Sequence, residues 1–91
     1  MVIRFAQSAF RHGISDERAL YVVANCPGAL YSSDEGTERD LATFLWADHH
    51  GVPLEVTAVE FENGDLLVIH AMRMRSKYRI DYARLLEWRE Q

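Results

Sequence analysis

The residues of this sequence that could carry out chemistry lie close together near its C-terminal end. Four candidates fall within nine residues of one another: His70, Arg73, Arg75 and Tyr78. Their side chains are of the kinds that can cleave RNA without a metal ion. The reaction needs a base for the 2′-hydroxyl, an acid for the leaving 5′-oxygen and a cation for the charge on the phosphorane. The two arginines are two residues apart, so on one strand face they would grip neighbouring phosphates with bidentate hydrogen bonds.

Charge is unevenly distributed along the chain. Ten basic and fourteen acidic residues give a net charge of −4, but six of the basic residues lie from Arg73 onward. We expect this basic segment to contact an anion, either a phosphate backbone or a carboxylate-rich partner. The residues that we expect to bind RNA are Arg73, Arg75, Lys77 and Arg79. A solvated strand end that pairs with the acidic surface is the alternative for the arginines. Because the whole chain is acidic, an RNA-cleaving activity would act on RNA that the ribosome positions.

Three side chains have one functional and one structural interpretation each. His12 precedes Gly13 and is either catalytic or a donor to the carbonyl groups at a helix end. His70 is either catalytic or a histidine at the rim of the core. Trp46 either stacks on an RNA base or packs in the core. The pair His49-His50 has no third ligand at a suitable spacing, so we expect no metal site.

Length and hydropathy place the chain among ordinary globular proteins. Its 91 residues, 48% hydrophobic and 26% charged, predict one domain. There is no apolar run of the ~20 residues that a membrane span needs, and the N-terminus lacks the apolar core of a signal peptide. We therefore expect a cytoplasmic protein that does not contact a membrane.

Helical spacing dominates the first third of the chain. Residues 2–5 are typical of a short strand, and residues 6–12 of a short helix that Gly13 ends. Ser15 is a good N-cap for a second helix that runs to about Asn25. Its apolar positions recur at helical spacing, at Ala19, Val22, Val23 and Cys26.

Strand patterns follow. Residues 29–40 are polar and acidic and predict a surface loop. Three antiparallel strands are then expected at residues 41–48, 54–61 and 66–74. Asn63-Gly64 predicts a hairpin with a type I′ turn, since both residues tolerate positive φ. A helix over about 76–91, with Asp81 as a candidate N-cap, completes the chain.

These elements predict an α+β fold in the order β-α-α-β-β-β-α. Two N-terminal helices and a C-terminal helix would pack on a four-stranded, mainly antiparallel sheet. Alternation along residues 66–74 places Val68 and His70 on one face, and Arg73 and Arg75 on the other.

Short motifs resemble a known family. Residues 11–15, RHGIS, followed by an acidic residue and Ala19, are similar to the Lys-His-Gly-Val-Ser helix junction of the BrnT-like toxins of the RelE/ParE superfamily. The Asn-Gly hairpin and the last strand, VIHA at residues 68–71 with basic residues after it, also resemble that family. The chain departs from the family at Met72, where an arginine is usual, and at Tyr78, where an acidic residue is usual.

The resemblance implies a function. It implies a RelE-like fold and an endoribonuclease that cleaves mRNA without metal or cofactor, as the toxin of a type II toxin–antitoxin system. The partner would be a small DNA-binding antitoxin encoded alongside, and an unpaired edge strand would receive it or mediate a homodimer. The alternative is a non-catalytic module that binds an acidic or helical partner through the basic C-terminal region. A small-molecule enzyme is disfavoured, because the chain has no glycine-rich phosphate loop.

Overall fold

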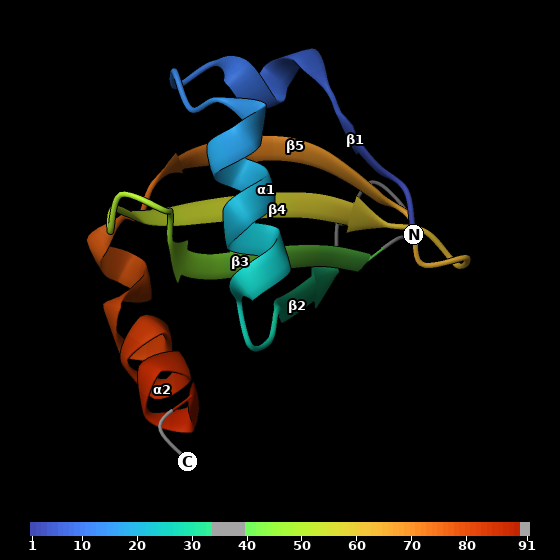
Figure 1. The fold of residues 1–91 in the computed structure, drawn as a ribbon. Helices are drawn as coiled ribbons and strands as arrows, with labels where there is room; N and C mark the ends of the chain where they lie inside the picture. Colours follow the sequence, from blue (N-terminus) through green and yellow to red (C-terminus); the bar gives the residue numbers. More distant parts are fainter. Residues whose placement is uncertain (34–39, 90–91) are drawn as a thin grey trace.

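A single mixed β-sheet organises the protein. The computed structural model describes residues 1–33 and 40–89. The described elements are β1 (Ile3–Phe5), the 3₁₀ turn η1 (Gln7–Phe10), α1 (Asp16–Asn25), β2 (Leu30–Ser33), β3 (Asp40–Ala47), β4 (Pro53–Glu60), β5 (Leu66–Arg73), the 3₁₀ turn η2 (Ser76–Tyr78) and α2 (Arg79–Arg89). The five strands lie in the order β1-β5-β4-β3-β2, and α1 crosses in front of β5, β4 and β3 (Figure 1). The predicted α+β class is confirmed.

The predicted details of two N-terminal helices and a four-stranded sheet are wrong. Residues 6–12 contain only the four-residue 3₁₀ turn η1, because a segment this short does not recover the cost of α-helix nucleation. The predicted loop over residues 29–40 begins with a fifth strand, β2, which pairs with β3. Its polar side chains do not prevent this, since an edge strand bonds through its backbone. The last residue of that predicted loop, Asp40, begins β3, and residues 34–39 lie outside the described residues.

The first strand makes the sheet mixed. β1 runs parallel to β5, with Ile3 opposite Leu66 and Phe5 opposite Val68. The backbone N–H of Val2 donates to Oδ1 of Asp65 at 2.8 Å, which holds the start of the chain against the hairpin. This pairing sends the chain along the outer edge of β5, and η1 then packs beside the same strand.

Helix α1 forms as its local sequence predicts. The Ser15 hydroxyl accepts from the backbone N–H of Arg18 at 3.2 Å, and two acidic residues lie in the first turn, where they complement the helix dipole. Its apolar stripe is buried at Ala19, Val22 and Val23. The stripe packs on the sheet residues of the main core: Leu45, Leu54, Val56, Ala58, Leu66, Val68 and Ala71.

The hairpin between β4 and β5 is confirmed, but its turn type differs from the prediction. Only Gly64 has positive φ, at +89°, whereas Asn63 does not. The N–H of Phe61 donates to the carbonyl of Asp65 at 2.9 Å, so three residues form the loop. The side chain of Asn63 instead accepts from the N–H of Asp65 at 3.0 Å.

An irregularity in β5 changes which side chains share a face. Ala58 of β4 pairs with Val68, yet the preceding residue, Thr57, pairs with His70, so Ile69 is an extra residue. Val68 and Ala71 are both buried in the core, which strict alternation forbids. The prediction that Val68 and His70 share a face is therefore wrong, and the bulge at Ile69 is the reason.

The chain ends in a helix that makes few contacts with the sheet. η2 and α2 leave the sheet at the end opposite the N-terminus and the hairpin (Figure 1). α2 begins at Arg79, two residues before Asp81, and Leu85 is its one buried residue. Trp88 remains 59% exposed. Among the described residues no helix has the length and apolarity needed to span a membrane.

Candidate functional site

The centre of the candidate site is a carboxylate that is fully buried in the sheet. Glu55 of β4 lies between Leu45 of β3 and Met72 of β5, its direct neighbours across the strands. Arg75, just beyond β5, donates to it three times: Nε to Oε1 at 2.7 Å, Nη2 to Oε2 at 2.9 Å and the backbone N–H to Oε1 at 3.1 Å. This is a bidentate ion pair with an added backbone bond.

The ion pair determines the charge state of both groups. Burial raises the pKa of Glu55, but the hydrogen bonds and the charge of Arg75 outweigh it and hold that pKa below its ordinary value. The same hydrogen bonds raise the pKa of Arg75 further above its ordinary value. Glu55 is therefore an ionised carboxylate, and Arg75 a cation, throughout the physiological range.

Arg75 is only partly occupied by this pairing. Its side chain is 47% exposed, and the guanidinium has five N–H groups, of which two bond to Glu55. The remaining three N–H groups form no hydrogen bond within residues 1–33 and 40–89 and can bind an anion. The buried carboxylate of Glu55 thus fixes the orientation of the Arg75 guanidinium, while part of the side chain remains exposed to solvent.

His70 approaches the same carboxylate from β5. Its Nε2 lies 3.5 Å from Oε2 of Glu55, within ion-pair distance but without a hydrogen bond, and is itself buried. Burial lowers the pKa of His70, the charge of Glu55 raises it, and Arg75 and His12 lower it again, so that the net pKa is below the ordinary value. His70 is therefore a neutral imidazole at neutral pH.

His12 lies next to His70. The turn between η1 and α1 places it there, and the two rings meet edge to face with their centroids 5.5 Å apart. Gly13, at φ +75°, allows the chain to reverse after this residue. His12 is exposed. Two imidazoles, a carboxylate and a guanidinium from three separate parts of the chain thus lie together; we call His12, Glu55, His70 and Arg75 the histidine–arginine site.

Strand alternation fails to describe the arginines. Arg73 is the last residue of β5 and pairs with Leu54, whereas Arg75 contacts the neighbouring residue, Glu55, which faces the other side of β4. The prediction that Arg73 and Arg75 share one strand face is therefore wrong. The predicted separation of His70 from Arg75 is wrong as well, because the strand ends before Arg75.

The remaining predicted residues surround the site at different distances. Tyr78 is half-buried against the core and acts electrostatically on Arg75, raising its pKa. The Nζ of Lys77 lies 5.0 Å from the centre of the Tyr78 ring. Arg73 and Arg79 are exposed, and neither forms an ion pair with another residue of the described part of the chain.

Trp46 packs in the core. Its residue exposure is 8%, the Tyr82 ring contacts it edge to face at 6.2 Å, and the guanidinium of Arg89 lies 5.4 Å from its ring centre. The low exposure and these contacts confirm the packing interpretation.

A second buried carboxylate organises the loop between β3 and β4. Asp48 accepts from Nε of Arg18 at 2.7 Å and from the backbone N–H groups of His50 and Val52 at 2.9 Å each. The rings of His49 and His50 lie 4.1 Å apart on this loop. Within residues 1–33 and 40–89, no three histidine, cysteine or acidic side chains gather as metal ligands would.

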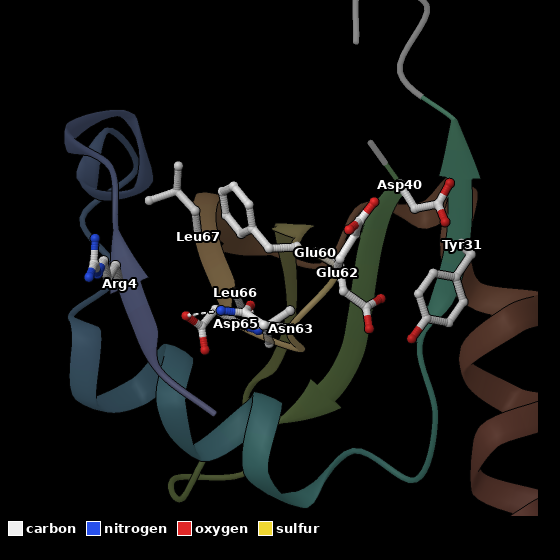
Figure 2. Close-up of a pocket in the computed structure, with 10 residues that line it drawn as sticks. Arg4, Tyr31, Asp40, Glu60, Glu62, Asn63, Asp65, Leu66 and Leu67 are labelled. Atoms are coloured by element: carbon white, nitrogen blue, oxygen red, sulfur yellow. Dashed lines mark hydrogen bonds between the residues drawn. The ribbon is translucent and has the colours of Figure 1, made fainter. Parts of the chain in front are cut away.

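The opposite end of the sheet carries a wide, acidic hollow. Figure 2 shows the carboxylates of Asp40, Glu60 and Glu62 on the side of Tyr31, with Arg4 on the far side. Partial burial raises the pKa of Tyr31, and the neighbouring carboxylates raise it further. No predicted site residue lines this hollow, and its charge would repel a phosphate.

Glu55 is the residue that sequence reasoning missed. A single glutamate between apolar residues in a predicted strand, LEVTAV, is a usable signal, because charged residues are rarely buried without a partner. The identity of the partner was not readable, since Arg75 follows twenty residues later and outside the strand.

Comparison of the chain with protein-family models, curated proteins and solved structures finds no match. The resemblance to the BrnT-like toxins therefore stays a prediction from the motifs. The function has to be inferred from the geometry of the histidine–arginine site.

Proposed function

We propose that this protein is a metal-independent endoribonuclease, acting as the toxin of a toxin–antitoxin pair, with the histidine–arginine site as its catalytic centre. One observation carries the proposal: a buried glutamate holds a half-exposed arginine beside two histidines. The arrangement supplies the three groups that RNA transesterification requires, namely a base, an acid and a fixed cation.

Roles follow from the environment of each side chain. His70 has a lowered pKa and is neutral, which suits the base that takes the proton of the 2′-hydroxyl. His12 is exposed beside it and suits the acid that protonates the leaving 5′-oxygen. Arg75, with three free N–H groups, would stabilise the negative charge that develops on the phosphorane.

Substrate binding would use the cations at the end of β5 and just beyond it. Arg73, Lys77 and Arg79 are exposed, and they lie near the end of the sheet where the site is formed. The acidic hollow lies about 17 Å further along β4, at five residues of ~3.3 Å each, and would keep phosphate away from that end. The net charge of −4 limits affinity for free RNA, so we propose ribosome-bound mRNA as the substrate.

The proposed partner is a small antitoxin that also binds DNA. The two outer strands, β1 and β2, each leave one backbone edge unpaired among the described strands. Either edge would accept a strand of the antitoxin or of a second copy of the chain.

Controlled expression in bacteria tests the proposal. We expect induction of the wild type to arrest growth and to produce RNA fragments with 5′-hydroxyl ends. The same cleavage should occur in cell extract with or without EDTA. His70→Ala and Arg75→Lys should each reduce cleavage about 100-fold or more, because one removes the base and the other removes the bidentate fork. Arg75→Lys retains the charge opposite buried Glu55, so the fold should persist, which circular dichroism checks.

Arg4→Ala is the matched control, since Arg4 is an exposed arginine at the other end of the sheet and should retain full cleavage. Normal growth with undegraded RNA after induction of the wild type would refute the proposal. Arrest that both site variants leave unchanged would also refute it.

A binding module is the second candidate, and α2 favours it. Ile80 and Trp88 are 62% and 59% exposed, and Trp88 borders a small hollow with Leu30 and Leu85. A helical partner with acidic residues would cover this surface beside the basic segment. If the protein is a binding module, the expression test should show unarrested growth. The protein should then also form a stable complex with its partner, which Trp88→Ala weakens.

A further inference from the structure

The buried position of Glu55 is not explained by packing. Its neighbours across the strands are the apolar residues Leu45 and Met72, and the residues before and after it in β4, Leu54 and Val56, are fully buried. A buried ion pair is often no more stabilising than apolar residues of similar size. The role of Glu55 therefore lies in the effect of its carboxylate on the side chains around it.

Each carboxylate oxygen has a separate task. Oε1 accepts from Nε and from the backbone N–H of Arg75, which holds both the side chain and the chain direction after β5. Oε2 accepts from Nη2 of Arg75 and faces Nε2 of His70 at 3.5 Å. The same oxygen thus lies between the proposed cation and the proposed base.

The two ring nitrogens of His70 have different surroundings. Nε2 is buried, without a hydrogen-bond partner, and faces the negative oxygen of Glu55. A proton on Nε2 would be attracted by this oxygen, whereas a lone pair there would be repelled. Nδ1 forms no hydrogen bond within the described residues and is left for solvent or substrate. The side chain as a whole is 27% exposed.

We propose that Glu55 is a positioning residue that holds His70 in the Nε2–H tautomer, with Nδ1 as the base, while it aims the free N–H groups of Arg75 at the scissile phosphate. This inference rests on the proposed function and specifies how its site is organised. It is the arrangement by which a buried carboxylate orients a catalytic imidazole.

The proposed step is balanced in protons and bonds. Nδ1 of His70 takes the proton of the 2′-hydroxyl, and O2′ forms a bond to phosphorus. The bond from phosphorus to O5′ breaks, and the leaving oxygen takes a proton from a ring N–H of His12. The products are a 2′,3′-cyclic phosphate and a 5′-hydroxyl. The positive charge that forms on His70 then lies beside the carboxylate of Glu55, which stabilises it.

Nitrogen NMR of the full chain tests the tautomer directly, without any RNA. In the wild type, above the pKa of His70, we expect the chemical shifts of a protonated Nε2 and an unprotonated Nδ1. A wild-type spectrum with the proton on Nδ1 would overturn the proposal, and this measurement does not depend on whether any variant folds.

Glu55→Gln provides the second readout. Its amide oxygen would replace Oε1, which accepts two bonds from Arg75, so its NH₂ group would face Nε2 of His70 and donate to it. We expect the proton of His70 to move to Nδ1, and the pKa of His70 to fall because the negative charge is lost while Arg75 and His12 remain. An unchanged tautomer and pKa in a folded Glu55→Gln protein would overturn the proposal.

Activity measurements then separate positioning from a purely structural role. We expect Glu55→Gln to lower kcat at least about 100-fold, because the base carries its proton on the wrong nitrogen, and to shift the acidic limb of the pH profile downward. Glu60→Gln, at the other end of β4, should leave the tautomer and kcat unchanged. If the wild type shows the expected tautomer but cleaves no RNA, the proposed function fails while the positioning of His70 by Glu55 stands.

Discussion

Two buried carboxylates in this protein each bind an arginine, but they differ in what surrounds the pair. Asp48 is enclosed by Arg18 and by two N–H groups of its own loop, and in the part of the chain that the structure describes no other ionisable side chain hydrogen-bonds to it. Glu55 faces a histidine as well as an arginine that is half exposed. We infer that Asp48 stabilises the loop between β3 and β4, whereas Glu55 orients groups that act on something outside the protein.

The stabilising role of Asp48 predicts a pH dependence. Burial, the largest single influence on Asp48, raises its pKa. The hydrogen bonds that Asp48 accepts from backbone N–H groups and from Arg18 together outweigh burial and lower the pKa from 3.8 to about 2. A lowered pKa means that the unfolded state binds more protons, so this stability is present above pH ~4 and is lost as the pH falls from about 4 to 2. We expect Asp48→Asn to cost about 2 kcal/mol in the free energy of unfolding at pH 7, and much less at pH 2.5.

Urea unfolding at both pH values measures this difference. Glu62→Gln, which removes an exposed carboxylate, serves as the control and should change the free energy little at either pH. A loss in Asp48→Asn of equal size at pH 7 and pH 2.5 would show that charge on Asp48 is not the cause.

At the scale of elements, two local irregularities in the strands place the site. The bulge at Ile69 keeps Val68 and Ala71 in the core while His70 faces the side of Glu55. The end of β5 at Arg73 then frees Arg75 to turn toward the same carboxylate. A regular strand through residue 75 would place the side chains of His70 and Arg75 on opposite faces. The site therefore depends on where the hydrogen-bond ladder of β5 is interrupted.

The hairpin that sets the register of β4 and β5 gives a prediction about Gly64. At φ +89° a side chain is strained even where nothing lies near it, and no atom lies within 4 Å of a Cβ built there. We expect Gly64→Ala to lower the free energy of unfolding by about 1 kcal/mol, and Gly64→Asn by less, because asparagine tolerates positive φ. Thermal unfolding of the three proteins tests this order; equal stability of both variants would contradict it.

At the scale of the whole molecule, opposite charges lie at opposite ends of the sheet. The acidic hollow lies where β4 ends and β5 begins, and the histidine–arginine site with the basic segment lies where β5 ends (Figures 1 and 2). This arrangement would orient an RNA strand toward one end of the protein despite the negative net charge.

The charge separation predicts how binding depends on salt. For single-stranded RNA, each phosphate contact contributes about −0.7 to the slope of log K against log salt concentration. We expect Arg79→Ala to make this slope shallower by about 0.7 in fluorescence anisotropy titrations with a short RNA oligonucleotide. Arg4→Ala, at the acidic end, should leave the slope unchanged. Equal slopes for the wild type and Arg79→Ala would exclude a phosphate contact at Arg79.

The amino-acid sequence alone determined the parts of this protein that depend on neighbouring residues. The N-cap at Ser15, the apolar stripe of α1 and the hairpin at Gly64 follow from backbone bonding and side-chain spacing within a few positions. The location of the basic segment was equally readable, because charge is a property of composition. The residue types of His12, His70 and Arg75 likewise make them candidates without any knowledge of their contacts.

Tertiary structure decided how those residues meet. The parallel pairing of β1, the strand β2 and the bulge at Ile69 depend on hydrogen bonds between segments far apart in the chain. The pairing of Glu55 with Arg75 depends on the register of two strands and on the position where one of them ends. Alternation within one strand carries no information about the register or about the end of the strand. The alternation pattern therefore placed His70 and Arg75 on opposite faces, although both lie next to Glu55.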